Sequence, residues 1–172
     1  ENIIKNNSGY ECSCDDVLFR FDQYVQEQRN EVALKFGNVC LSYGELDEKV
    51  RLLANNLKSL GVKKNDFVVI CTERSIEMMV GIMAVLKAGA AYVPIAPNYP
   101  SERKQYIIND CNSKVVLVYK SEVDTDRYVI DLEKPIQQID QLDEKNDSID
   151  DFDCAAYCIY TSGTTGNPQG VV

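Results

Sequence analysis

The chain has 172 residues, the size of one domain or of part of a larger one, and apolar residues make up 45% of it, enough to build a core. Eighteen Lys and Arg residues against 27 Asp and Glu residues give a net charge of −9, which argues against nucleic acid or an anionic membrane as a partner. The sequence contains no histidine, which excludes Ser-His-Asp and Cys-His catalysis within the chain. No uncharged run is long enough to span a membrane.

The first third of the chain predicts two helices around a hairpin. Apolar residues recur at helical spacing over 15–29, and two short apolar runs within 32–41 flank a Gly-Asn turn. Ser42 and Glu45 have the spacing of a capping box, in which each side chain accepts a hydrogen bond from the backbone N–H of the other residue. The helix that they begin is expected to end at Gly61.

The middle of the chain alternates between strands and helices. Apolar runs predict strands at 67–71, 91–95, 115–119 and 128–130, and the spacing of apolar residues predicts helices at 76–86 and 101–111. Gly89 is expected to cap the first of these helices, Tyr92 to join the core and Ser101 to serve as N-cap of the second. Such alternation indicates βαβ units, so the predicted fold is α/β, with a largely parallel sheet flanked by helices.

The seven cysteines are an odd number and are scattered among apolar segments. This pattern indicates buried, reduced thiols in a cytoplasmic protein. The two close pairs, Cys12 with Cys14 and Cys154 with Cys158, lack the Cys-x-x-Cys spacing of common zinc ligands, so we predict no metal site. The chain starts at Glu1 without an initiator Met or a signal sequence, and we expect this end to be a fragment boundary.

Residues 140–153 interrupt the alternation with seven acidic residues and a single lysine. We interpret this stretch as an exposed connection rather than as a carboxylate cluster for a metal. The run 155–160 then carries no charge, and predicts a central, buried strand.

A stretch rich in Gly, Ser and Thr follows directly, at 161–170. Glycines let backbone N–H groups turn toward a polyanion, and hydroxyl groups add donors, as a phosphate-binding loop requires. The stretch has neither the Walker A spacing nor the G-x-G-x-x-G spacing, and its composition alone also allows an ordinary surface turn.

Three motifs resemble those of a known family. Residues 160–171 read Y-T-S-G-T-T-G-N-P-Q-G-V, which closely resembles the phosphate-binding loop Y-T-S-G-T-T-G-x-P-K-G-V of the adenylate-forming (AMP-binding) superfamily. Residues 86–100 read L-K-A-G-A-A-Y-V-P-I-A-P-N-Y-P, similar to a block characteristic of adenylation domains of nonribosomal peptide synthetases, and residues 41–46 look like an earlier motif of these enzymes. The resemblance implies that 1–172 is the N-terminal portion of one adenylation domain, with the N-terminal subdomain fold of adenylate-forming enzymes. We interpret 86–100 as structural.

The resemblance also implies the residues that contact ATP. The β- and γ-phosphates would be held by Thr161, Ser162, Gly163, Thr164, Thr165 and Gly166. Gln169 stands where the family has a lysine, so it is implied as a weaker contact that keeps two N–H donors but lacks the charge. Ala96 likewise replaces the usual aspartate of the second motif. No catalytic residue is implied within the chain, because the adenine, ribose, magnesium and catalytic-lysine motifs of the family lie downstream of Val172.

The implied activity is that of an AMP-forming ligase of secondary metabolism. An amino acid reacts with Mg²⁺-bound ATP to give an aminoacyl-adenylate and pyrophosphate, and the acyl group then passes to phosphopantetheine on a carrier. The implied partners are the rest of the adenylation domain and the peptidyl carrier and condensation domains, and the location is cytoplasmic. We expect the 172 residues alone to be inactive. Two alternatives stay open: a degenerate or split adenylation domain that acts as a structural module, and part of an acyl-CoA or aryl-acid ligase.

Overall fold

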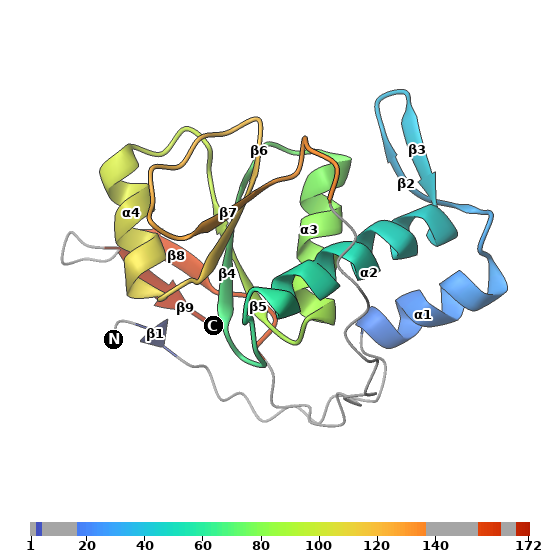
Figure 1. Cartoon of the computed structure of the whole chain (residues 1–172), viewed down its shortest axis with the longest axis horizontal. Helices are drawn as coiled ribbons and strands as arrows, with labels where there is room; N and C mark the ends of the chain where they lie inside the picture. Colours follow the sequence, from blue (N-terminus) through green and yellow to red (C-terminus); the bar gives the residue numbers. More distant parts are fainter. Residues whose placement is uncertain (1–2, 5–16, 137–154, 163–167) are drawn as a thin grey trace.

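The structure, a computed structural model, describes residues 3–4, 17–136, 155–162 and 168–172 (Figure 1). The helices are α1 (Val17–Glu27), α2 (Tyr43–Ser59), α3 (Ile76–Lys87) and α4 (Ser101–Asp110). The strands are β1 (Ile3–Ile4), β2 (Val32–Phe36), β3 (Val39–Ser42), β4 (Phe67–Thr72), β5 (Ala91–Ile95), β6 (Val115–Tyr119), β7 (Tyr128–Asp131), β8 (Ile159–Ser162) and β9 (Pro168–Val171). The acidic run expected at 140–153 lies outside the described residues. No helix in the described part of the chain has both the length and the apolar character that a bilayer span needs.

A four-stranded sheet in the order β5-β4-β6-β7 forms the centre of the fold, and every pairing in it is parallel. Alternate side chains of β4 enter two different cores. Val68 and Ile70 pack on the face that α2 and α3 cover, whereas Val69 and Cys71 pack on the face that α4 covers (Figure 1). Because helices cover both faces, the strands read as continuous apolar runs. The α/β fold with a parallel sheet is therefore confirmed.

Local signals place the N-terminal elements correctly. Strands β2 and β3 pair antiparallel around Gly37, which has a φ of +59°, as the Gly-Asn turn predicts. Both halves of the capping box are present before α2, with the N–H of Glu45 donating to Ser42 Oγ over 3.2 Å and the N–H of Ser42 donating to Glu45 Oε2 over 2.8 Å. Ser42 also lowers the pKa of the Glu45 carboxyl through these hydrogen bonds. Gly61 follows the helix at a φ of +83°.

Two of the predicted caps need correction by one residue. The N-cap of α4 is Pro100 rather than Ser101, and it makes no side-chain capping bond. Ser101 already belongs to the helix, because Pro100 has the extended backbone that an N-cap adopts. The C-cap of α3 is Ala88, and Gly89 follows it at a φ of +81°, the left-handed conformation that glycine supplies after a helix. The structural interpretation of 86–100 is otherwise consistent with this helix-to-strand turn, and Tyr92 packs half-buried against the core.

A second, three-stranded sheet has the order β1-β9-β8. Strand β1 pairs parallel with β9, and β9 pairs antiparallel with β8. An isolated parallel bridge between Tyr92 and Tyr157 joins the segment before β8 to the edge of the larger sheet. The expectation that 155–160 would be a central, buried strand is wrong, because β8 lies at the edge of the three-stranded sheet. Cys158 is fully buried, but Tyr157 and Ile159 are 45% and 47% exposed, because helix α4 covers one face of the segment only.

Candidate functional site

The described part of the phosphate-loop motif is a β-hairpin. Strands β8 and β9 run antiparallel, with Thr161 opposite Gln169 and Ser162 opposite Pro168 as the last two pairs before the connection 163–167. The structure thus brings Thr161 and Gln169, which are eight positions apart in the sequence, into one cross-strand pair. The other predicted loop residues, Gly163, Thr164, Thr165 and Gly166, lie outside the described residues.

The outer face of the hairpin offers neutral polar groups. Thr161 is exposed, and Gln169 lies half-buried within β9. The described hairpin residues, 155–162 and 168–172, include no charged side chain. These residues can therefore attract an anion only through their N–H and O–H dipoles. Such dipoles suit a polyanion whose charge is neutralised by other groups.

The inner face of the hairpin is fixed to helix α4. Cys158 and Tyr160 point into the core beside Ile107, Ile108 and Cys111. The hydroxyl of Tyr160 donates a hydrogen bond of 2.7 Å to Asp110 Oδ2 at the end of α4. Burial, with the neighbouring Asp110 carboxylate, raises the pKa of the Tyr160 hydroxyl far above its usual range.

Two of the buried thiols, Cys111 and Cys158, are poor nucleophiles. Burial raises the pKa of Cys111 to about 12, and burial together with the nearby Asp110 raises the pKa of Cys158 to about 11. Both side chains therefore stay protonated near neutral pH, and a thiol attacks far more slowly than a thiolate. Cys71 is buried as predicted, but Cys40 is exposed because it lies on the outer side of the β2–β3 hairpin. Among the described residues, no group of three His, Cys, Asp or Glu side chains is placed to hold a metal ion.

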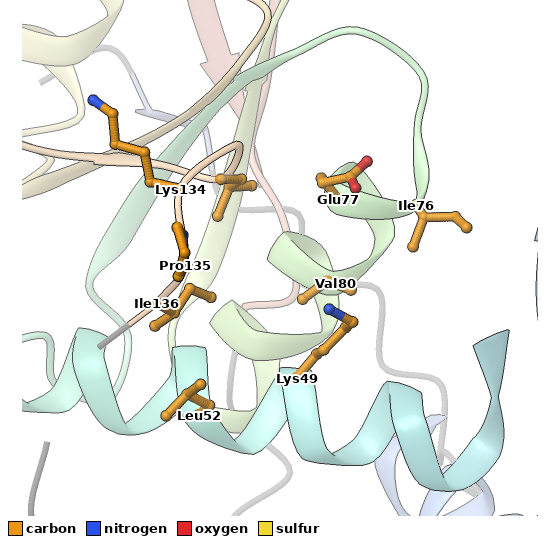
Figure 2. A pocket seen from close by; sticks show the side chains of 9 residues that line it. Lys49, Leu52, Ile76, Glu77, Val80, Lys134, Pro135 and Ile136 are labelled. Carbon is orange, nitrogen blue, oxygen red and sulfur yellow. The ribbon is translucent and has the colours of Figure 1, made fainter. Parts of the chain in front are cut away.

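A separate pocket of about 150 Å³ lies between α2, α3 and the segment after β7 (Figure 2). Its wall is largely apolar, with Leu52, Val80 and Ile136 among the lining residues, and Lys49, Glu77 and Lys134 add charged groups (Figure 2). No residue of β8 or β9 lines it. The pocket is therefore not the predicted phosphate site.

The motif geometry agrees with a comparison against protein families. The model of the AMP-binding enzyme family matches residues 21–172. The chain belongs to this family. The match includes α2, α3, α4, the part of α1 from residue 21 onward and every strand except β1, so the resemblance drawn from the three short motifs is confirmed.

The curated AMP-binding relatives include large peptide synthases. The chain is 39% identical over 155 residues to Bacitracin synthase 2 of Bacillus licheniformis and 40% identical over 158 residues to Tyrocidine synthase 3 of Brevibacillus parabrevis. Each alignment covers 88% of this chain, but only 6% of the first relative and 2% of the second. The chain thus spans only a small part of the length of these relatives.

Solved structures of the AMP-binding family share the fold. The Klebsiella oxytoca NpsA N-terminal subdomain in complex with 3-hydroxyanthranilyl-AMSN matches with a TM-score of 0.74 and 29% identity, over 90% of this chain and 39% of that chain. NpsA-ThdA, an artificially fused adenylation-PCP di-domain of a nonribosomal peptide synthetase from the same organism, matches with a TM-score of 0.79 and 28% identity, over 94% of this chain and 33% of that chain. The fold is therefore that of the N-terminal subdomain of adenylate-forming enzymes.

The sequence analysis missed the residues that hold the hairpin in place. Asp110 gave no signal beyond its position at the end of a helix, and its partner Tyr160 is 50 residues away. Tyr160 and Gly170 belong to the recognised AMP-binding motif, but their roles depend on contacts between elements distant in sequence. A carboxylate at a helix C-terminus was the available clue, because helix dipoles disfavour negative charge there.

Proposed function

We propose that this chain supplies the contacts to the β- and γ-phosphates of ATP in an amino-acid adenylation domain of a nonribosomal peptide synthetase. The observation that carries the proposal is the β8–β9 hairpin, which pairs Thr161 with Gln169 at the base of a Gly- and Thr-rich connection in a member of the AMP-binding family. The names of the curated relatives, all peptide synthases in the matches given above, favour an amino acid as the substrate.

The work of these residues is to bind and orient. The hydroxyls of Thr161, Ser162, Thr164 and Thr165 and the N–H groups around Gly163 and Gly166 would donate hydrogen bonds to phosphate oxygens, holding the triphosphate while the substrate carboxylate attacks the α-phosphorus. Donors fixed before the reaction stabilise the charge that gathers on the departing pyrophosphate. Gln169 would donate through its amide where the family uses a lysine, so the contact would keep the ionised phosphate acceptor but lack the charge attraction of an ammonium group.

Magnesium and phosphopantetheine belong to the proposal for the whole enzyme. Mg²⁺ bound with ATP would neutralise part of the phosphate charge, and phosphopantetheine on a carrier domain would accept the acyl group. No magnesium ligand is assigned within the described residues, since they hold no suitable cluster of acidic side chains. We place the condensation and peptidyl carrier domains, and the rest of the adenylation domain, among its partners. ATP-dependent chemistry and free thiols at Cys71, Cys111 and Cys158 fit a cytoplasmic location.

An aryl acid is the second candidate substrate. The NpsA subdomain, which matches at 29% identity, was solved with a 3-hydroxyanthranilyl ligand. One of the proteins similar to this chain therefore binds an aryl group. The curated relatives at 39–40% identity are peptide synthases, which is why the amino acid comes first.

ATP–pyrophosphate exchange by the full-length protein tests the proposal. We expect exchange with one or a few members of a panel of the twenty amino acids, and none with benzoic acids or with fatty acids plus coenzyme A. Exchange with a benzoic acid alone would identify the second candidate, and exchange with no acid would favour a structural module. The 172 residues alone should show no exchange, because the resemblance assigns the adenine, ribose and lysine contacts to other segments.

Variants of the connection separate a phosphate site from a simple turn. Gly163→Val would place a branched side chain where the phosphates approach, and should lower the exchange rate by a factor of roughly ten or more, as expected for the loss of one or two hydrogen bonds. Thr165→Ala, which deletes one hydroxyl donor, should lower it less. An unchanged rate and ATP affinity in Gly163→Val would mean that the connection is only a turn.

A further inference from the structure

Tyr160 links helix α4 to the β8–β9 hairpin. Its side chain is only 7% exposed, and its hydroxyl donates to Asp110 Oδ2 over 2.7 Å. Asp110 is the last residue of α4, and Tyr160 lies in β8, directly before Thr161. A hydrogen bond from a hydroxyl to a carboxylate is shorter and stronger than one between neutral groups. Helix α4 and the hairpin are therefore joined by one strong bond within the larger hydrophobic contact.

Asp110 has no evident role within its own helix. The last turn of α4 contains no basic residue, and a negative charge at a helix C-terminus faces the negative end of the helix dipole. A carboxylate at this position is therefore unfavourable for the helix alone. The hydrogen bond from Tyr160 offsets that disadvantage and accounts for the residue type at this position.

Gly170 fixes the other side of the Tyr160 ring. It is the cross-strand partner of Tyr160 in β9. A Cβ atom added to Gly170 would lie 3.1 Å from Cζ and 3.2 Å from Cε2 of Tyr160, and 2.8 Å from Cys158 Sγ. The ring thus lies directly against the backbone of β9, which leaves no room for a side chain. Tyr160 is held by α4 at its hydroxyl and by β9 at its ring.

This contact lies one residue pair from the candidate site. Thr161 and Gln169 follow Tyr160 and Gly170 in the register of the hairpin, and successive strand residues are about 3.3 Å apart. We propose that Tyr160 and Asp110 are positioning residues, whose hydrogen bond fixes the β8–β9 hairpin on α4 and so sets the placement of Thr161 and Gln169 toward the phosphates of ATP. The proposal rests on the proposed function for its ligand, but not for the contact itself.

The hydroxyl of Tyr160 remains a donor throughout the physiological range. Burial and the adjacent carboxylate both raise its pKa, so the proton stays on the tyrosine. The effect of losing this bond should therefore be the same across neutral pH, and can be measured at a single pH.

The test uses four variants of the full-length protein in ATP–pyrophosphate exchange, with the amino acid that gives the fastest exchange in the panel. Tyr160→Phe keeps the ring on Gly170 and removes only the hydroxyl, and Asp110→Ala removes the acceptor. Each should raise the KM for ATP roughly tenfold, the effect of one hydrogen bond to a charged group, while kcat and the KM for the amino acid change less than about twofold. Asp110→Asn keeps an acceptor oxygen, so its KM for ATP should lie much closer to that of the unmodified protein than the KM of Asp110→Ala does. Tyr157→Phe, on the same segment but with a half-exposed side chain, is the matched control and should behave as the unmodified protein.

The double variant Tyr160→Phe/Asp110→Ala should have a KM for ATP no higher than that of the more affected single variant, because the two residues act as one unit. The proposal is overturned if Tyr160→Phe matches the Tyr157→Phe control. It is also overturned if kcat, both KM values and the melting temperature change together, since that would indicate a merely structural role.

Hydrogen exchange separates a failure of this proposal from a failure of the proposed function. If the unmodified protein shows no ATP–pyrophosphate exchange, the proposed function fails. Hydrogen exchange of the backbone amides in β8 and β9 still reports whether the contact holds the hairpin. These amides should exchange at least several-fold faster in Tyr160→Phe than in Tyr157→Phe. Equal rates would overturn the positioning role whatever the enzyme does.

Discussion

The four-stranded and the three-stranded sheet bury their strands in different ways. In the four-stranded sheet, β4 and β6 carry apolar side chains on both faces, because α2 and α3 cover one side and α4 covers the other. In the three-stranded sheet, β8 and the residue before it are covered on one side only, so buried Cys158 and Tyr160 alternate with exposed Ile159 and Thr161. The middle strands of the first sheet, β4 and β6, are thus scaffold strands with both faces covered. The second is anchored on one face and keeps its other face available, which is where the candidate site residues lie.

The largest expected difference between the two sheets is in stability. Leu117 of β6 is fully buried, so Leu117→Ala should lower the free energy of unfolding by about 2–5 kcal/mol. Ile159 of β8 is 47% exposed, and Ile159→Ala should cost about 1 kcal/mol or less. Urea denaturation of both variants measures the difference. Equal losses would show that the second sheet is packed as tightly as the first.

A gain of charge on the open face should affect ATP binding without affecting the fold. Gln169→Lys adds a charge-assisted donor and should lower the KM for ATP roughly tenfold in the full-length protein, which corresponds to about 1.4 kcal/mol. The half-buried position in β9 can accept lysine, because its long stem lets the ammonium group reach solvent. Gln26→Lys adds the same charge on exposed α1 and serves as the control. If both variants improve ATP binding equally, a general charge effect is responsible.

The smallest expected effect concerns the thiols beneath the hairpin. The pKa of Cys111 is raised to about 12 and that of Cys158 to about 11, from a reference value of 9.0. A group with a raised pKa in the folded state stabilises the fold fully below its unfolded pKa, and this contribution is lost as the pH rises through the folded value. The melting temperature should therefore begin to fall above about pH 9. A Cys111→Ala/Cys158→Ala variant should show a shallower fall between about pH 8 and 10.5 than a Cys40→Ala control, and identical slopes would exclude the thiols as its cause.

Features of the fold that depend on neighbouring residues were predictable from the sequence. The capping box at Ser42, the turn at Gly37 and the apolar run of β4 each depend on a few adjacent residues, and each is found as expected. The covering of both sheet faces also follows from continuous apolar runs that alternate with helices.

Features that depend on distant contacts were not predictable. Residues 168–171 have the Gly, Pro and Gln composition of a loop, yet they form β9 because β1 and β8 pair with it on either side. The uncharged run 155–160 did not reveal which of its faces would be covered. For the candidate site, the motif predicted the residues, but the pairing of Thr161 with Gln169 and the bond from Tyr160 to Asp110 required the fold.

The pairing of β1 with β9 has a consequence for the order in which the protein folds during synthesis. Ile3 pairs with Gly170 and Ile4 with Val171, so the three-stranded sheet joins the first described residues to the last (Figure 1). Strands β4 to β7 lie within 67–131, and can pair while the rest of the chain is still being translated. At about 5–20 residues per second, the ribosome needs several more seconds to deliver β8 and β9. Pairings between such distant segments also form slowly. The four-stranded sheet of the nascent chain therefore forms first, and β1 has no strand to pair with until β9, which carries Gln169, leaves the ribosome.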